Sequence, residues 1–457
     1  MAKNKHKQIE QQMNNVLKYQ SNELSKLKAN SDKERNKREF EIEELERKLI
    51  DLGVDPKSVA KNEFDNIPKK VMIVPSWENL YKEAEKIVGN SCDIDSMLTE
   101  DEIQNNEDAI CKLRDEYNQI HKLDKIDIAI SAIAGIIGSA VDLLMVGIPK
   151  RGPDGLKAGT LSNYIRKKFE ETFPEEEMQK LANLQESKVP FDAQDNRNTV
   201  EFVTGLSAYY HRLLSLGHDP LLGFAVGVFD ILTGRMTTID KNGNIISQVM
   251  KNYEHRKEKD IFEALAKQFT HLKSDVTTSM GLPAPLMDVF NLFQFGSIGE
   301  ENQTIAEIVQ GMYYEGYDFI HFCSLSIPVM IIEVIVRVSY ACKCLKERKS
   351  LSQSIPFSLN RNKHPKLSTM LFIAHSGASA INVGKIYFTK NPLAINYPQW
   401  IAFAKYSYKQ LLWTLIEKPD ARIEYVNDKL ENRWNEIATK VDSSFNEFTK
   451  DYTVVFE

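Results

Sequence analysis

Cysteine is scarce in this sequence, with five residues in 457. An odd number of cysteines spread along a long chain does not form a disulfide framework, and the absence of a C-x-x-C motif argues against a cysteine-based structural zinc site. The basic N-terminus is not followed by an apolar segment, so no secretory signal is expected. We therefore expect the protein to be cytoplasmic. The cysteines are Cys92, Cys111, Cys323, Cys342 and Cys344.

A surplus of positive charge is also lacking, because 58 Lys and Arg residues face 64 Asp and Glu residues, for a net charge of −6. Nucleic-acid-binding proteins normally carry a basic surplus, so no nucleic-acid partner is expected. The motifs GxxxxGK[ST], GxGxxG, GxSxG and HExxH are absent. Nucleotide-driven and α/β-hydrolase mechanisms thereby lose their main support, and whether the protein is an enzyme stays open.

What the sequence has in abundance is helical patterning. Composition is ordinary for a globular protein, at 42% hydrophobic and 27% charged residues. The patterning predicts a mainly α protein: a multi-helix globular body with an N-terminal coiled-coil-like helix and one small β-hairpin. We expect a helical arm over residues 1–54, a charged helical connector over 55–125, and a helical body with glycine-rich apolar helices over 126–457.

The arm shows a coiled-coil rhythm between residues 8 and 52. Apolar residues follow a and d spacing in its first half and resume that spacing from Ile42 to Leu52. Gln20 and the polar stretch 31–38 interrupt the seam. The alternative is a solvated helix that packs only at its two ends. Residues 71–74 (VMIV), ended by Pro75, predict a lone strand or an extended strap.

The hairpin is expected at 236–249. Residues of alternating polarity flank Asn242-Gly243, a pair that favours the tight turns joining two antiparallel strands. One hairpin is marginally stable by itself, so it must pack on the helices.

The longest nearly uncharged apolar run is Ile126–Ile148, and small residues recur along it at helical spacing. Such a stripe lets another helix backbone approach closely. A second apolar zone, 201–234, repeats the small-residue spacing in a helix that is expected to begin with Asp219 as N-cap. The two helices are therefore predicted packing partners. The small residues are Ser131, Gly135 and Ser139 in the first helix, and Gly223 and Gly227 in the second.

Two segments, 126–148 and 319–340, have enough length to span a bilayer. The first contains Asp127 and Asp142, and the second contains Glu333 and Arg337. An Asp or Arg at the middle of a spanning helix costs roughly 2.5–3.5 kcal/mol on insertion scales. We therefore expect these helices to pack in a soluble core, with membrane association an alternative that is not favoured.

Four residues form a candidate metal site: His211, His218, Asp219 and His375. An unbroken helix would place the imidazoles of His211 and His218 two turns apart on one face, with a carboxylate adjacent, and such donors suit a divalent metal that activates water. The alternative is structural: His218 satisfies backbone groups at a helix junction, and His375 is a hydrogen-bonded core residue.

The leading functional hypothesis is a non-enzymatic assembly or interaction protein that self-associates or binds a protein partner through its N-terminal arm. It follows from the heptad rhythm and from the absence of catalytic signatures. One alternative is an effector that inserts into membranes conditionally. The other is a metal-dependent hydrolase that uses the His/Asp cluster.

Overall fold

The computed structural model describes residues 2–53, 70–89, 97–153, 155–296, 302–347, 354–450 and 452–456. The protein is mainly helical, as predicted, and its described strands form two-stranded sheets. Internal contacts divide the chain into two units. Unit 1 comprises residues 1–119 and 419–457, and unit 2 comprises residues 120–418. The sequence analysis assigned 126–457 to one body; in the structure the segment after Lys418 groups with the N-terminal region.

Unit 1 contains the long helix α1 (Ala2–Asp51), whose length matches the predicted arm. Among its described side chains, those buried are Asn14, Asn15 and Val16, where α1 packs on α2 (Trp77–Val88). Its second half is solvated and carries i,i+4 ion pairs such as Arg35–Glu39. Such pairs stabilise an exposed helix by only about 0.2–0.5 kcal/mol each.

The rest of unit 1 joins distant parts of the chain. Strand β1 (Lys70–Val74) is the expected VMIV strand, and it pairs in parallel with β6 (Tyr452–Phe456). Helix α3 (Glu100–His121) and helix α15 (Lys418–Phe448) bring the rings of Tyr117 and Tyr425 to a centroid distance of 5.4 Å. Cys92 lies outside the described residues.

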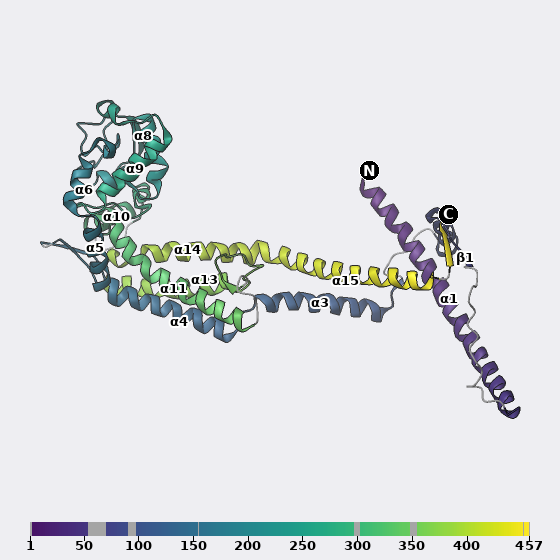
Figure 1. The fold of residues 1–457 in the computed structure, drawn as a ribbon. Coiled ribbons are helices and arrows are strands. Elements are labelled where there is room, and N and C mark those ends of the chain that lie inside the picture. The colour runs from purple at the N-terminus through teal and green to yellow at the C-terminus, as the bar shows by residue number, and fades with distance from the viewer. Residues whose placement is uncertain are drawn as a thin grey trace. The chain divides into compact units, whose positions relative to one another are not determined.

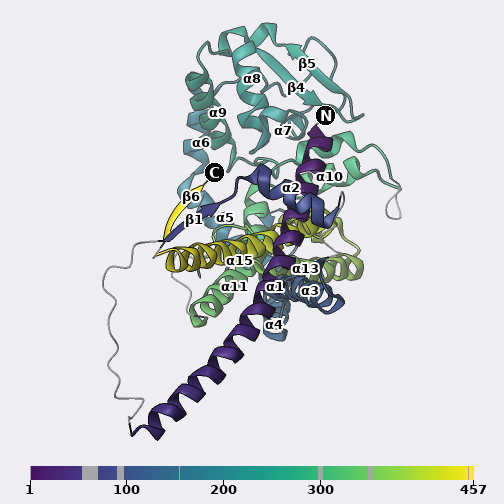
Figure 2. The same ribbon diagram turned by 90° about the vertical axis from the view of Figure 1, so that its right-hand side faces the viewer.

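Four helices of unit 2 form a bundle (Figure 1). Helices α11 and α13 contact each other, and both contact α4 and α14 (Figure 2). Their buried side chains include Ile332, Val336, Leu371 and Tyr406. The bounds are α4 (Lys125–Val141, continued by the π-helix η3, Asp142–Val146), α11 (Phe319–Lys346), α13 (Leu367–Thr389) and α14 (Tyr397–Leu412, continued by the π-helix η10, Trp413–Glu417).

Two helical segments of the described chain, Glu100–Val146 and Phe319–Lys346, are long and apolar enough to cross a membrane by length and composition alone. The second segment begins where the sequence suggested, at Phe319. The apolar pattern itself starts near residue 304 and predicts one helix over 304–345, but α10 (Ile305–Tyr314) ends before α11 begins. The break occurs because Asp318 caps α11 and accepts a hydrogen bond from the backbone N–H of His321 at 2.8 Å.

Small residues lie where the bundle helices meet. A Cβ atom on Gly135 would stand 2.6 Å from the carbonyl oxygen of Ala374 in α13, and one on Gly138 would meet Ile332 of α11 at 2.5 Å. The predicted pairing of α4 with the second glycine-rich helix is wrong. Gly223 and Gly227 lie instead against the side chain of Gln268 in α9.

The remainder of unit 2 is a lobe of short helices around buried Phe191, Leu214, Ile231 and Met236. The predicted hairpin is confirmed: β4 pairs antiparallel with β5, and Gly243 turns the chain at φ +82°. A second small hairpin is formed by β2 and β3. The lobe's elements are β2 (Lys150–Gly152), β3 (Gly155–Lys157), α5 (Thr160–Thr172), α6 (Glu175–Ala182), η4 (Gln185–Ser187), α7 (His211–Leu214), η5 (Leu216–His218), η6 (Leu222–Phe224), α8 (Val226–Thr233), β4 (Arg235–Ile239), β5 (Ile245–Val249), η7 (Lys251–Arg256), α9 (Ile261–Asp275) and η8 (Met287–Leu292).

Candidate metal centre

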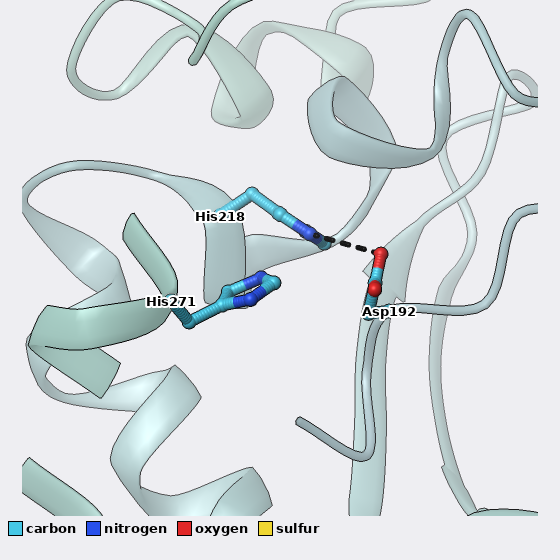
Figure 3. Close-up of side chains that lie close together, drawn as sticks. All are labelled: Asp192, His218 and His271. Atoms are coloured by element: carbon cyan, nitrogen blue, oxygen red, sulfur yellow. Dashed lines mark ion pairs between the residues drawn. The ribbon is translucent and has the colours of Figure 1, made fainter. Parts of the chain in front are cut away.

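Three elements of the lobe bring histidine and aspartate side chains together. Asp192 lies in the extended segment after η4, His218 ends η5, and His271 comes from α9 (Figure 3). One ligand atom from each of these residues lies within 4.8 Å of the ligand atoms of the other two. His211, at the start of α7, joins the cluster, with its ring 5.4 Å from that of His218. Asp275 follows His271 by four residues and so lies on the same face of α9.

Two sets of hydrogen bonds, one at the start and one in the middle, fix the position of helix α9. At its start, the side chain of Asp260 accepts hydrogen bonds from the backbone N–H groups of Phe262 and Glu263. In its middle, Gln268 Nε2 donates to the carbonyl oxygen of Gly217 at 2.7 Å, which ties α9 to η5. The position of His271 relative to His218 is thereby set by a direct contact between their two elements.

Phe191 packs against two of the imidazoles, which lie 5.0 Å apart. Its ring packs edge-on against His218 and His271, with centroid distances of 5.2 and 5.4 Å. A Cβ atom on Gly217 would stand 2.6 Å from this ring, so η5 approaches Phe191 this closely only because residue 217 is glycine. Asp192 directly follows Phe191, so the buried Phe191 ring helps to fix the position of Asp192 beside the histidines.

The distances within the centre are too long for good hydrogen bonds but suit a shared ion. Asp192 Oδ1 lies 3.5 Å from His211 Nε2 and 3.7 Å from His218 Nε2. Asp275 Oδ2 lies 3.9 Å from His218 Nε2 and 3.6 Å from His271 Nε2. Ligands about 2.0–2.1 Å from a tetrahedral zinc ion stand about 3.4 Å apart. The donor atoms are spaced near that value.

Several of these buried atoms have no hydrogen-bond partner: Nε2 of His211, His218 and His271, together with Asp275 Oδ2. Each such atom costs about 1–3 kcal/mol if it is left unsatisfied, so a group of them facing one point demands an explanation. A bound cation would satisfy all of them together.

The outer contacts orient the imidazoles for binding. His211 Nδ1 lies 2.9 Å from the carbonyl oxygen of Ala208, and His271 Nδ1 lies 2.9 Å from that of Ser187. Because a carbonyl can only accept, each Nδ1 must carry the proton and donate, which leaves Nε2 with a free lone pair. Arg212 Nη2 donates to Asp275 Oδ1 at 3.0 Å and holds that carboxylate in place.

The protonation states also favour a metal. Burial, together with the neighbouring imidazoles of His271 and His211, lowers the pKa of His218 to about 4, so this ring is neutral at pH 7. Burial by itself would raise the pKa of Asp192, but His211, His218 and His271 hold it well below its ordinary value. A neutral imidazole and an ionised carboxylate are the forms that bind a metal.

The centre is enclosed except on one side. The side chains of His211, His218, His271 and Asp275 are at most 6% exposed, whereas that of Asp192 is 29% exposed. Access from solvent therefore passes beside Asp192. In proteins, catalytic zinc sites differ from structural ones in keeping one ligand position for water or substrate.

Of the four residues proposed from sequence, the structure brings two together. His211 and His218 are neighbours, although not on one continuous helix as expected, because α7 ends at Leu214 and the chain bends into η5. Asp219 is turned away: its Oδ1 accepts hydrogen bonds from the backbone N–H groups of Leu221 and Leu222, and its Oδ2 accepts one from Leu286. It is a capping residue.

His375 also lies elsewhere, in α13 of the bundle. Its ring stacks on Tyr406 at 5.1 Å, and its Nδ1 lies 3.2 Å from Gln399 Nε2, which can donate to it. Asp192, His271 and Asp275 were not predicted from the sequence. The spacing of His271 and Asp275 on one helix was a usable signal, whereas Asp192 lies outside any helix or strand and no spacing marked it.

Comparison of the chain with protein-family models, with curated proteins and with solved structures found no match.

Proposed function

We propose that the centre binds a divalent transition metal, with zinc the best fit, and that the protein is a metal-dependent hydrolase. The observation that supports this most directly is the convergence of unpartnered, buried imidazole nitrogens on two carboxylates. Imidazole nitrogen with carboxylate oxygen is a donor set typical of zinc. The proposed metal ligands are His218, His271 and Asp192. His211 and Asp275 lie beside them.

A zinc ion held by these residues would lower the pKa of a bound water and make that water a nucleophile near neutral pH. The chain's own residues have separate tasks. Backbone carbonyls orient the imidazoles of His211 and His271. Asp275, oriented by Arg212, is placed to accept a proton within the enclosed site. An ester or phosphoester group would approach from the side of Asp192, whose side chain is 29% exposed.

The test is metal content after chelator treatment and reloading with zinc, measured by mass spectrometry. Wild type should bind about one ion per chain, and His218→Gln or His271→Gln should lose it, because ligand loss weakens such sites strongly. His375→Gln is the matched control, since it removes a buried histidine outside the centre and should leave the metal content unchanged. Wild type that stays metal-free would overturn the proposal.

Hydrolysis is tested separately, with a panel of carboxylic and phosphoric esters assayed with and without zinc. Zinc-dependent turnover that His218→Gln abolishes would support the hydrolase. Stoichiometric metal without turnover on any ester would leave a structural metal centre and refute the enzymatic part.

A second function, protein association through α1, is favoured by a different observation. Leu24, Leu27, Ile42 and Leu45 are each more than half exposed on this helix. An apolar seam of this kind is stabilised by a partner helix, including one from a second copy. Sedimentation of the full chain, of a chain lacking residues 1–54, and of Leu27→Glu tests the role in self-association. Equal oligomeric states in all three proteins would refute a role of α1 in self-association.

A further inference from the structure

The polarity of α4 is inverted relative to a helix in a soluble core. Its buried residues are all small or acidic, and none is a large aliphatic side chain. The isoleucines face outward instead: Ile133 is 52% exposed and Ile136 is 58% exposed, and Leu144 in the π-helix that follows is 80% exposed. The buried set is Asp127, Ser131, Ala134, Gly135, Gly138 and Ser139, followed by Asp142 in the π-helix.

Helix α11 extends this apolar surface. Met330, Val334 and Val338 recur every four residues and are 61%, 57% and 56% exposed. The two helices are in contact, and partly buried Ile130 and Ile335 pack in the same core cluster. We call the exposed surface of Ile133, Ile136, Leu144, Met330, Val334 and Val338 the α4–α11 face.

The acidic residues of α4 are turned inward, whereas Glu333 and Arg337 of α11 form a partly exposed ion pair with each other. The carboxylate of Asp142 pairs with Lys385 of α13 at 3.1 Å, and both side chains are at most 6% exposed. Asp127 is fully buried, and Lys343 donates to it at 2.6 Å. These helices contact each other through small residues, keep ion pairs inside and expose aliphatic side chains. This pattern is typical of helices that face the hydrocarbon of a lipid bilayer.

Cations flank the α4–α11 face at both ends. Exposed Lys122 and Lys125 lie at the start of α4, and exposed Lys346 lies at the end of α11. These two helix ends are close together, because Lys343 forms an ion pair with Asp124. Exposed Lys150 follows the other end of α4. An apolar strip bordered by lysines complements a bilayer with anionic headgroups.

Helix α14 exposes lysines among its apolar side chains. Helix α14 contacts α11 and α13, as α4 does, and its outward residues include exposed Lys405 and Lys409. Lipid surrounding the whole bundle would meet these charges in mid-helix, whereas lipid on the α4 side alone would not. A protein partner would be expected to find hydrogen-bonding groups on the face, about one per 100–200 Å² of interface. The six side chains of the α4–α11 face offer no such group, and the ion pair of Glu333 and Arg337 borders them.

We propose that the α4–α11 face rests on the surface of an anionic lipid bilayer and inserts its aliphatic side chains to the acyl boundary. This inference is independent of the metal centre, because it uses none of the residues of that site. It places the chain at a membrane surface without requiring any helix to cross it.

The experiment measures cosedimentation of the full-length protein with phosphatidylcholine vesicles, with and without phosphatidylserine. Wild type should bind vesicles, and more tightly when phosphatidylserine is present. The double variant Ile133→Gln with Ile136→Gln should lower the vesicle partition coefficient by about tenfold or more. Val334→Gln with Val338→Gln, on α11, should act in the same direction. The matched control is Tyr408→Gln with Leu411→Gln on α14, whose side chains are equally exposed.

Thermal melts accompany the binding assay, because these exposed substitutions should leave folding unchanged. The proposal is overturned if wild type does not bind vesicles, or if the α4, α11 and α14 variants all bind as wild type does. It is also overturned if wild type is a dimer without lipid and the α4 variant dissociates it, because a second copy then covers the face.

Discussion

The contact between α4 and α13 can be tested with two glycines that differ in whether a neighbouring helix lies against them. Gly135 in α4 and Gly377 in α13 are both interior helix residues. A Cβ atom on Gly135 would stand 2.6 Å from the carbonyl oxygen of Ala374, whereas one on Gly377 would meet nothing within 4 Å. Gly135→Ala and Gly377→Ala therefore make the same chemical change in a closed and an open environment.

The magnitudes follow from these distances. Alanine in place of glycine in an exposed helix interior stabilises by up to about 1 kcal/mol. At Gly135 a steric clash opposes this gain in stability. The added Cβ atom would meet the backbone of α13, so the two helices would have to move apart. Overpacking of this kind costs about 1–3 kcal/mol. We expect Gly377→Ala to stabilise slightly, and Gly135→Ala to be less stable than Gly377→Ala by about 1–3 kcal/mol.

Scanning calorimetry of both variants and wild type, in one buffer, measures this difference. A change of 1 kcal/mol moves the melting temperature by about 2–4 °C in large domains. Equal stabilisation by the two substitutions would refute the reasoning, because it would mean that α13 does not approach α4 at Gly135. A loss in both would show instead that the helices do not tolerate alanine at all.

Three further predictions concern single residues. Asp142→Asn should destabilise unit 2 by about 3 kcal/mol in urea unfolding, since it leaves buried Lys385 without its counter-ion, and the double change with Lys385→Met should recover most of the loss. Burial raises the pKa of Asp230 to about 6 from 3.8, so the folded state loses stability as the pH rises through 4 to 6. Asp230→Asn cannot ionise, but its amide nitrogen cannot accept one of the two hydrogen bonds from Thr237. The stability of the variant relative to wild type should therefore rise by up to about 3 kcal/mol between pH 4 and pH 7, as melts at both pH values would show. Gly243→Val should destabilise the hairpin by about 1–2 kcal/mol, because its φ of +82° is unfavourable for a β-branched residue; an unchanged melting temperature would contradict this.

The sequence by itself determined the elements that depend on neighbouring residues. The heptad rhythm of α1, the small-residue spacing of α4 and α13, and Asn242-Gly243 in the hairpin all act within a few residues of chain. Such patterns report backbone preference and local hydrogen bonding directly. The hydrogen bonds that Asp219 accepts from the backbone of the next turn are the same kind of signal, and they turn its carboxylate away from the histidines.

Only the tertiary structure decided which residues share a site and which helices pack together. Asp192, His218 and His271 come from three elements, and nothing in their spacing shows that Gln268 and Phe191 hold those elements together. In α4 the small residues marked the side that packs, but they could not show that the partners are α13 and α11. The glycines and serines of α4 turn inward because only small side chains let two helix backbones touch, and the isoleucines are left outside.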